Sequence, residues 1–501
     1  MRINILKPIF SNFHLPERQY LIPALGFYVS VIALAILYGL LATINNAIFI
    51  ALGAGFLIGM ALLFSPRWNI WLVLILGLFV AGLLPLYLSA FSSKAAWGVS
   101  LLGFIVLASA LLRLITHPEC SKNTPAFIWL TLAFMLYAIF DSLLQWNSAG
   151  EIVTGFKRYF QAFGLIFIFS WLLINAKEIQ RWQKLVLFVA LVQLPFAVYQ
   201  LIVYVPMRES VSAYTPGLVP IDVVSGTFGA TPLGGGNNAQ MATFLLIAFA
   251  FLVARKREGA LSTKRLLGLG IIILAPIFLG ETKITVVLLP LIFLVLYRKE
   301  LIAKPHKAII GGAIVTLLTV GAGYSYLQIM QKDLHEGIET TLSYNFYEQG
   351  YGGFALNRTT VLSFWAQQQE KHGPVSIMFG NGLGSAHEGT RGHIAQHYSG
   401  YGVGLTAAST LLWELGIIGT LLFLSIFVYA WRCANQIQKR TIDPIIKADT
   451  QGIQVALAVF AFYLIYRSSL LDLLSFQIIF ALILGYLAWL HNNVEKEQTG
   501  E

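Results

Sequence analysis

Long apolar runs are the feature that most constrains how this chain can fold. A membrane-spanning helix needs about 20 mostly apolar residues, and runs of that kind recur between residues 21 and 490. Hydrophobic residues make up 57% of the sequence. Charged residues make up 11%, against roughly 25% in soluble domains. These values exclude a soluble enzyme, a disordered protein and a nucleic-acid-binding protein, and predict an all-α integral membrane protein.

The apolar runs predict about 14 transmembrane helices. Glu281, Thr282 and Lys283 interrupt one apolar stretch, so we expect a short hairpin tip at the outer surface there. The helices are expected near residues 21–42, 46–64, 69–91, 95–116, 125–144, 159–175, 185–205, 239–254, 266–280, 284–297, 308–329, 406–431, 451–466 and 472–490.

This pattern divides the chain into five parts. They are a cytoplasmic N-terminus (1–20), eleven helices (21–329) with an outer loop (206–238), a large and partly helical periplasmic loop (330–405), three further helices (406–490) and a cytoplasmic tail (491–501). The N-terminus lacks the features of a cleaved signal peptide, so the first apolar run is expected to be a retained helix.

The distribution of positive charge supports this topology. The net charge is +10, from 33 Lys and Arg against 23 Asp and Glu. With the N-terminus inside, most of the Lys and Arg residues fall in cytoplasmic loops, as the positive-inside rule requires. Both termini are then cytoplasmic, and the charge needs no nucleic-acid partner. Cys120 and Cys433 also fall on this side, where thiols stay reduced.

Two outward loops, 206–238 and 330–405, are much longer than the others. Loops of such length are usually functional or disordered, and the aromatic residues of the second, such as Trp365, argue against disorder. The second loop also contains five of the nine histidines, which can exchange protons near neutral pH. They are His335, His372, His387, His393 and His397. An active site is therefore expected to face outward.

Two features of the large loop suggest anion binding. Arg358 precedes apolar residues at helical spacing, so it is expected near the start of an amphipathic helix, where phosphate also binds well. A solvated surface arginine is the alternative. Gly380, Gly382 and Gly384 follow, and they suit either a phosphate-binding loop or a tight turn.

Three further positions outside that loop are candidates. Asn237 lies in a glycine-rich segment directly before a helix, which is typical of backbone shaped around a ligand or of a flexible connector. Lys283 is either a second cation facing the cavity of Arg358 or a residue reaching to the membrane surface. Glu414 lies in an apolar zone, where a carboxylate is costly and usually functional.

Two acidic residues at helix ends complete the candidates. Asp472 follows Arg467 closely in R-S-S-L-L-D, and we expect the two to form an ion pair at the last outer turn. Asp141 is expected to be a helix-end residue.

In order along the chain, these residues resemble the O-antigen ligase and polymerase superfamily of bacterial envelope glycan assembly. Four stretches match its pattern. They are S-G-T-F-G at 225–229 with Asn237-Asn238, E-T-K-I-T at 281–285, Arg358 with Trp365 followed by His372-Gly373-Pro374 and F-G-N-G-L-G, and E-L-G-I-I-G at 414–419. Lys283 stands where members usually have Arg. One departure is that ligases carry a His-Asn pair shortly before the Glu, where this chain has Leu405-Thr406.

The resemblance implies chemistry on glycans carried by undecaprenyl diphosphate. Transfer expels a diphosphate, so Arg358 and Lys283 are expected to bind it, with Gly380, Gly382 and Asn237 nearby supplying further contacts. The acceptor hydroxyl needs a base. His397 is the first candidate, His393 the second, and Glu414 completes the expected catalytic set. No metal and no cofactor is expected.

The sequence thus predicts an inner-membrane glycosyltransferase that polymerises lipid-linked oligosaccharides on the periplasmic face. The missing His-Asn pair favours a polymerase over an O-antigen ligase, which would transfer the glycan to lipid A–core. A protein O-oligosaccharyltransferase is a third reading. A flippase and a chain-length regulator are expected partners. The rival class is a transporter, but transporters place ionisable residues in discontinuous helices and often show repeats.

Overall fold

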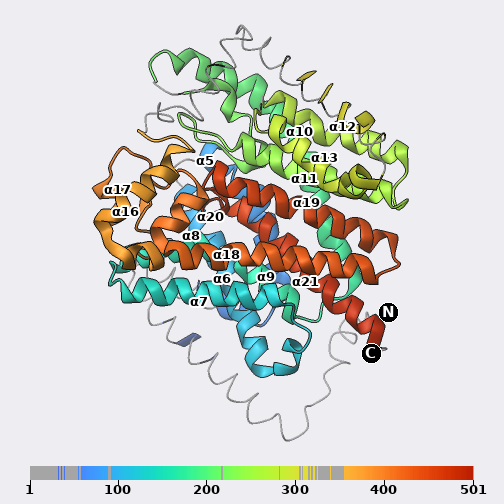
Figure 1. The fold of residues 1–501 in the computed structure, drawn as a ribbon, viewed down its shortest axis with the longest axis horizontal. Helices are drawn as coiled ribbons and strands as arrows, with labels where there is room; N and C mark the ends of the chain where they lie inside the picture. Colours follow the sequence, from blue (N-terminus) through green and yellow to red (C-terminus); the bar gives the residue numbers. More distant parts are fainter. Residues whose placement is uncertain are drawn as a thin grey trace, which may run out of the picture. The chain divides into compact units, whose positions relative to one another are not determined.

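The computed structural model describes residues 58–87, 92–215, 218–280, 282–303 and 355–499, with isolated positions elsewhere. The chain divides into two compact units, Met1–Ser65 and Pro66–Glu501, and the elements below belong to the second. Within the described ranges every regular element is a helix (Figure 1). The β-contact among them is an isolated bridge between Ala230 and Gly236. The predicted all-α class is confirmed.

Seven helices in the described ranges are long and apolar enough to cross a membrane. They are α6 (Ser92–Thr116), α7 (Ala126–Leu144), α10 (Ala176–Ser212), α11 (Asn238–Arg257), α18 (Ala407–Arg440), α19 (Pro444–Tyr466) and α21 (Leu474–Thr499). A bent pair, α8 (Ala149–Phe160) with α9 (Phe163–Trp171), makes an eighth candidate. The chain is therefore a helical membrane protein.

Other predicted spans are helical but do not meet that length and composition. Residues near 69–91 form α4 (Pro66–Ile75), a π-helical turn η1 (Leu76–Val80) and α5 (Leu84–Tyr87). Helix α12 (Thr263–Leu279) has 17 residues. Helix α13 (Thr285–Ala303) includes the charged sequence R-K-E. The runs predicted near 21–42, 46–64 and 308–329 lie wholly or mostly outside the described residues.

Local capping explains where the long helices begin. At α10, Glu178 N–H donates to Asn175 Oδ1 (2.8 Å) and Asn175 N–H donates to Glu178 Oε2 (3.3 Å), a reciprocal cap. Thr406 and Ser409 form the same arrangement at α18. Helix α10 runs on to Ser212, so the outer loop that follows is shorter than the predicted 206–238.

The core forms around α9, whose residues are all buried and which packs against α6 and α21. Glycine lets α6 and α9 approach closely: a Cβ on Gly164 of α9 would lie 2.4 Å from the main-chain nitrogen of Leu107 of α6. Helix α18 packs along α7, as Figure 1 shows, and also against α16 (Thr360–Phe379) and α19.

Three helices are interrupted, and the interruptions shape the candidate site. The α8–α9 pair bends by 53° after Phe160. Helix α18 breaks at Gly416 (φ 63°, ψ −165°), and α16 is kinked at Gly373. A Cβ on Gly416 would lie 2.4 Å from Met378 O, so the end of α16 rests against the break in α18. The prediction of a continuous helix over 406–431 was wrong at this point, because only glycine adopts that backbone conformation readily.

Candidate functional site

A glycine loop follows α16 and docks on the break in α18. Gly380 and Gly382 have φ of 87° and 82°. Gly380 N–H donates to Ser376 O (2.9 Å), and Gly382 N–H donates to Glu414 O (2.8 Å). A Cβ on Gly380 would lie 2.5 Å from the Glu414 carbonyl. These two N–H groups are thus bound within the chain, so of the two sequence interpretations the geometry fits the tight turn.

Glu414 lies beneath this loop and is 1% exposed. Ala386 N–H donates to its Oε1 (3.2 Å). The Arg158 charge and the Tyr159 hydroxyl act on the carboxylate electrostatically. Within the described part of the chain, however, neither Glu414 Oε2 nor the Tyr159 hydroxyl makes a hydrogen bond of ordinary geometry. The Tyr159 hydroxyl and Gly384 N–H nevertheless approach the carboxylate as weak donors, so the carboxylate is only partly satisfied.

Helix α8 supplies charged residues that the sequence analysis did not single out. Arg158 forms an ion pair with Asp472 of α20 (Ser469–Asp472), with Nε to Oδ1 at 3.1 Å. The predicted pair between Arg467 and Asp472 was therefore wrong. Arg467 ends α19, whereas Asp472 lies at the far end of the short helix that follows and meets α8.

Two predicted histidines lie on α17 (His393–His397), a single helical turn. His393 N–H donates to Glu151 Oε1 (2.9 Å), and its Nδ1 lies 3.3 Å from Glu151 Oε2. His397 is exposed, with its ring edge against Tyr398. Glu151 and Glu414 both contact the loop of residues 384–386, so the histidines lie over the same loop as the buried carboxylate.

His387 was not among the catalytic candidates but lies nearer to the buried charges. Burial lowers the pKa of His387 to about 4; the Arg158 charge acts in the same direction and Asp472 against it. The imidazole is therefore neutral at pH 7. A strongly amphipathic helix over 149–160, which the topology treated as a connecting loop, was the signal that could have drawn attention to this region.

Arg358 lies where the sequence predicted, just before the start of α16. Asn357 Oδ1 accepts the N–H groups of Thr359 (2.9 Å) and Thr360 (2.8 Å), which fixes the helix entry. Arg358 Nε donates to Tyr466 O (2.8 Å), and its guanidinium lies 4.4 Å from the centroid of the Tyr466 ring.

Asp222 lies within electrostatic range of Lys283 and of two arginines. It lies in a turn of 3-10 helix, η4 (Pro220–Val223), and burial raises its pKa although the charges of Arg208, Arg467 and Lys283 oppose that shift. Arg467 follows directly on Tyr466, the residue that holds Arg358. We call Arg208, Lys283, Arg358 and Arg467 the cation cluster.

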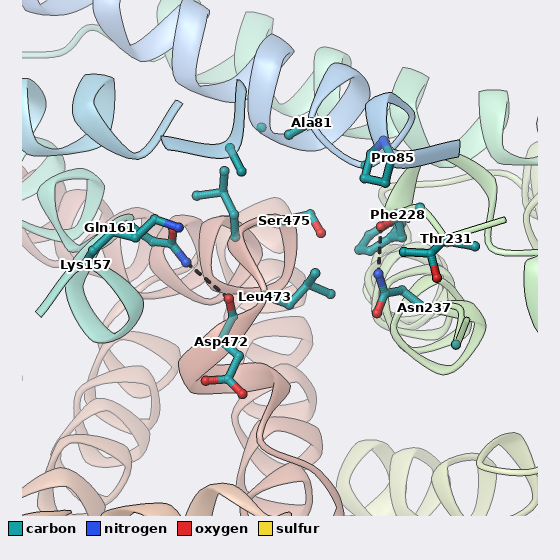
Figure 2. Close-up of a pocket in the computed structure, with 17 residues that line it drawn as sticks. Ala81, Pro85, Lys157, Gln161, Phe228, Thr231, Asn237, Asp472, Leu473 and Ser475 are labelled. Atoms are coloured by element: carbon teal, nitrogen blue, oxygen red, sulfur yellow. Dashed lines mark hydrogen bonds between the residues drawn. The ribbon is translucent and has the colours of Figure 1, made fainter. Parts of the chain in front are cut away.

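Asn237 lies on the wall of a pocket (Figure 2), and its neighbour Asn238 donates from Nδ2 to Asp222 Oδ1 (3.2 Å). The pocket encloses about 710 Å³, part of it open to solvent. Segments from five parts of the chain form it: residues 77–85, Ala96 of α6, the loop 228–237, the end of α8 with the α8–α9 bend, and residues 472–475. Asn237 Nδ2 donates to Phe228 O (3.0 Å) on one wall, and Asp472 lies on another.

No protein-family model matches the chain, and no curated protein matches it significantly. The family resemblance therefore stands on the sequence motifs alone. In the ranges that the structure describes, no group of three or more His, Cys, Asp or Glu side chains is arranged to hold a metal ion.

Proposed function

We propose that this protein is a glycosyltransferase of the bacterial inner membrane. It would polymerise oligosaccharide repeat units carried on undecaprenyl diphosphate, at the periplasmic face, in a chain of about 14 spans with both termini in the cytoplasm. The main support is the convergence of several of the described outward segments. The glycine loop, α8 and α20 surround Glu414 and the Arg158–Asp472 pair, and the cation cluster comes from outward segments as well.

The cation cluster suits the leaving group. Expulsion of a diphosphate develops negative charge, which fixed cations stabilise if they are already aimed at it. Arg358 is held by Tyr466 in both a hydrogen bond and a cation–π contact, so its position is set before any ligand binds. Lys283 is exposed and belongs to the same group of charges through Asp222.

The base in this proposal is a histidine of α17. The sequence put His397 first and His393 second. The Glu151 carboxylate now favours His393, because a carboxylate within reach of one ring nitrogen orients the imidazole. Nε2 of His393 would then take the proton of the acceptor hydroxyl.

Two other functions share parts of this support. An O-antigen ligase would use the same donor and differ in its acceptor, lipid A–core. A lipid-linked glycan transporter is favoured by a separate observation: Arg158 and Glu414 lie next to breaks in helices, as ionisable residues of transporters often do.

The test is incubation of the purified protein with undecaprenyl-diphosphate oligosaccharide and no other acceptor, with the product separated on a gel. A ladder is expected, and Arg358→Ala should abolish it. Arg440→Ala is the matched control, because Arg440 pairs with Glu495 far from the cation cluster. Product only after addition of lipid A–core would make the protein a ligase. No product with either acceptor would contradict the proposal and favour the transporter.

The choice of base has its own test in the same assay. His393→Gln should remove most of the activity and His397→Gln should not. The reverse result would restore His397 as the base.

A further inference from the structure

The pocket beside Asn237 contains a polar side chain that the chain itself does not satisfy. Ser475, the second residue of α21, is 4% exposed, and its hydroxyl has no hydrogen-bond partner in the described residues. Figure 2 shows this hydroxyl directed into the space between Leu473 and Phe228. A buried hydroxyl without a partner costs free energy, so its presence on a pocket wall points to a ligand that supplies the missing bond.

The rest of the lining limits what that ligand can be. One wall is apolar, with Pro85, Phe228 and Leu473. Around it lie groups that can bond a hydroxyl: the main-chain oxygen of Asp472, which accepts from Gln161 Nε2 (3.4 Å), and the Asn237 amide, which has a carbonyl oxygen left after its N–H group binds Phe228 O. An apolar face ringed by such groups matches a pyranose, which has a C–H face and hydroxyls at its edge.

Charge argues against a phosphate in the same place. Arg158, the arginine nearest this wall, is already engaged in its ion pair with Asp472, so it does not offer a free cation to a phosphate. Lys157 is the cation of the pocket wall, and its ammonium lies 4.9 Å from the centroid of the Trp97 ring. The cation cluster, by contrast, contains three arginines and a lysine.

We propose that this pocket binds one uncharged sugar ring of the glycan substrate. The assignment to a glycan rests on the proposed function, whereas the preference for an uncharged sugar rests on the lining. Asp472 links the pocket to the candidate site, because its partner Arg158 also acts on Glu414. Ser475, Asn237 and Asp472 are thus specificity residues of this pocket.

Binding is tested without turnover, on the purified full-length protein in detergent. Methyl glucoside, methyl galactoside, methyl N-acetylglucosaminide, methyl glucuronide and inorganic phosphate are titrated separately and followed by saturation-transfer NMR. At least one uncharged glycoside should bind, and Ser475→Ala should weaken it about five-fold, the effect of one lost hydrogen bond. Ser170→Ala is the matched control: Ser170 is also 4% exposed with an unpartnered hydroxyl, but it lies on α9 away from the pocket.

A second variant keeps the proposal testable if Ser475→Ala does not fold. Thr231 is exposed at the pocket rim, so Thr231→Trp should fold normally and block the pocket. Glycoside binding should then disappear. Unchanged binding in both variants, equal loss in Ser170→Ala, or binding of phosphate in place of every uncharged glycoside would overturn the proposal.

The outcomes separate this inference from the proposed function. Glycoside binding at the pocket without any ladder in the transfer assay would keep the sugar site and reject the transferase. A ladder that Ser475→Ala and Thr231→Trp leave unchanged would keep the transferase and reject the sugar site.

Discussion

Two buried carboxylates, Asp449 and Glu414, differ in how completely the protein satisfies them. Asp449 of α19 is fully buried and receives three donors: Arg255 Nε (2.7 Å), Arg255 Nη2 (2.8 Å) and the Tyr486 hydroxyl (2.7 Å). Glu414 of α18 is 1% exposed and receives a hydrogen bond from Ala386 N–H, while its second oxygen makes none of ordinary geometry.

The difference in hydrogen bonding indicates different roles for the two carboxylates. Arg255 is on α11 and Tyr486 on α21, so the closed group at Asp449 joins three long helices. By the predicted topology it lies toward the cytoplasm. By the same predicted topology Glu414 lies toward the periplasm, and it sits at a helix break under a loop. A polar network whose hydrogen bonds are all made rigidifies a core. A carboxylate with an incompletely bonded oxygen can exchange a proton or bind a ligand. We therefore assign stability to the first region and chemistry to the second.

The largest effect on stability is expected from substitution of Asp449, which Arg255 and Tyr486 bind. Asp449→Ala removes the fully buried member of the pair and leaves the partly buried Arg255 charge and the Tyr486 hydroxyl without their acceptor, which should lower the free energy of unfolding by up to about 3–5 kcal/mol. Thermal unfolding in detergent measures it. Arg440→Ala breaks an ion pair with partly exposed side chains and should cost less than about 1 kcal/mol. Similar costs in the two variants would show that Asp449 does not hold the helices together.

Lowering the pH should destabilise the protein through protonation of His387, which lies in the loop above Glu414. The pKa of His387 falls from the usual 6.5 to about 4 in the folded protein, so the unfolded chain binds more protons between those values. Stability is unaffected above pH 6.5 and falls as the pH drops toward 4, by up to about 3 kcal/mol. His387→Gln should remove this part of the pH dependence. If unfolding curves of the two proteins keep the same pH slope, the histidine is not buried in its neutral form.

Substitution of Glu414 should reduce activity strongly and stability little, the reverse of what is expected at Asp449. Glu414→Gln keeps the shape of the side chain but removes the acid, so transfer should fall about 100-fold, as for loss of an acid–base group. The unfolding temperature should change little. Transfer activity and the unfolding temperature are measured on the same preparation. The assignment of chemistry to Glu414 is contradicted if Glu414→Gln unfolds as readily as Asp449→Ala while its folded fraction keeps full activity.

The smallest effect concerns the helix break next to Glu414. Gly416→Ala puts a Cβ 2.4 Å from Met378 O on a backbone with φ of 63°, so it should cost about 1–3 kcal/mol. Gly98→Ala is the control, because that helical position is open and alanine should stabilise it by about 0.5–1 kcal/mol. Equal stability of the two variants in thermal unfolding would mean that the break is not maintained.

The positions of the helices were predicted better from the sequence than the contacts between them. Apolar runs located α6, α7, α10, α11, α18, α19 and α21, since a spanning helix is readable from composition alone. Arg358 at the entry to α16 and a tight turn at Gly380 and Gly382 were also among the predictions. Each of these features depends on neighbours in the sequence.

Contacts between distant segments were not readable in this way. Arg158 and Asp472 are separated by 314 positions, and nothing in the spacing of Arg467 and Asp472 indicates that helix α20 turns the aspartate toward α8. Helix α8 was missed for a different reason. It is polar on one face, so a search for apolar runs treats it as a loop. The charged groups around Glu414 were lost with it.

Product analysis of the transfer reaction tests the central claim most directly. Purified protein in lipid nanodiscs is supplied with undecaprenyl-diphosphate repeat units, and mass spectrometry counts new glycosidic bonds and released undecaprenyl diphosphate. The account predicts one released lipid diphosphate for each new bond, and loss of both in folded Glu414→Gln. Lipid-linked units that stay monomeric with wild-type protein, while the same protein in sealed vesicles moves them across the bilayer, would contradict it.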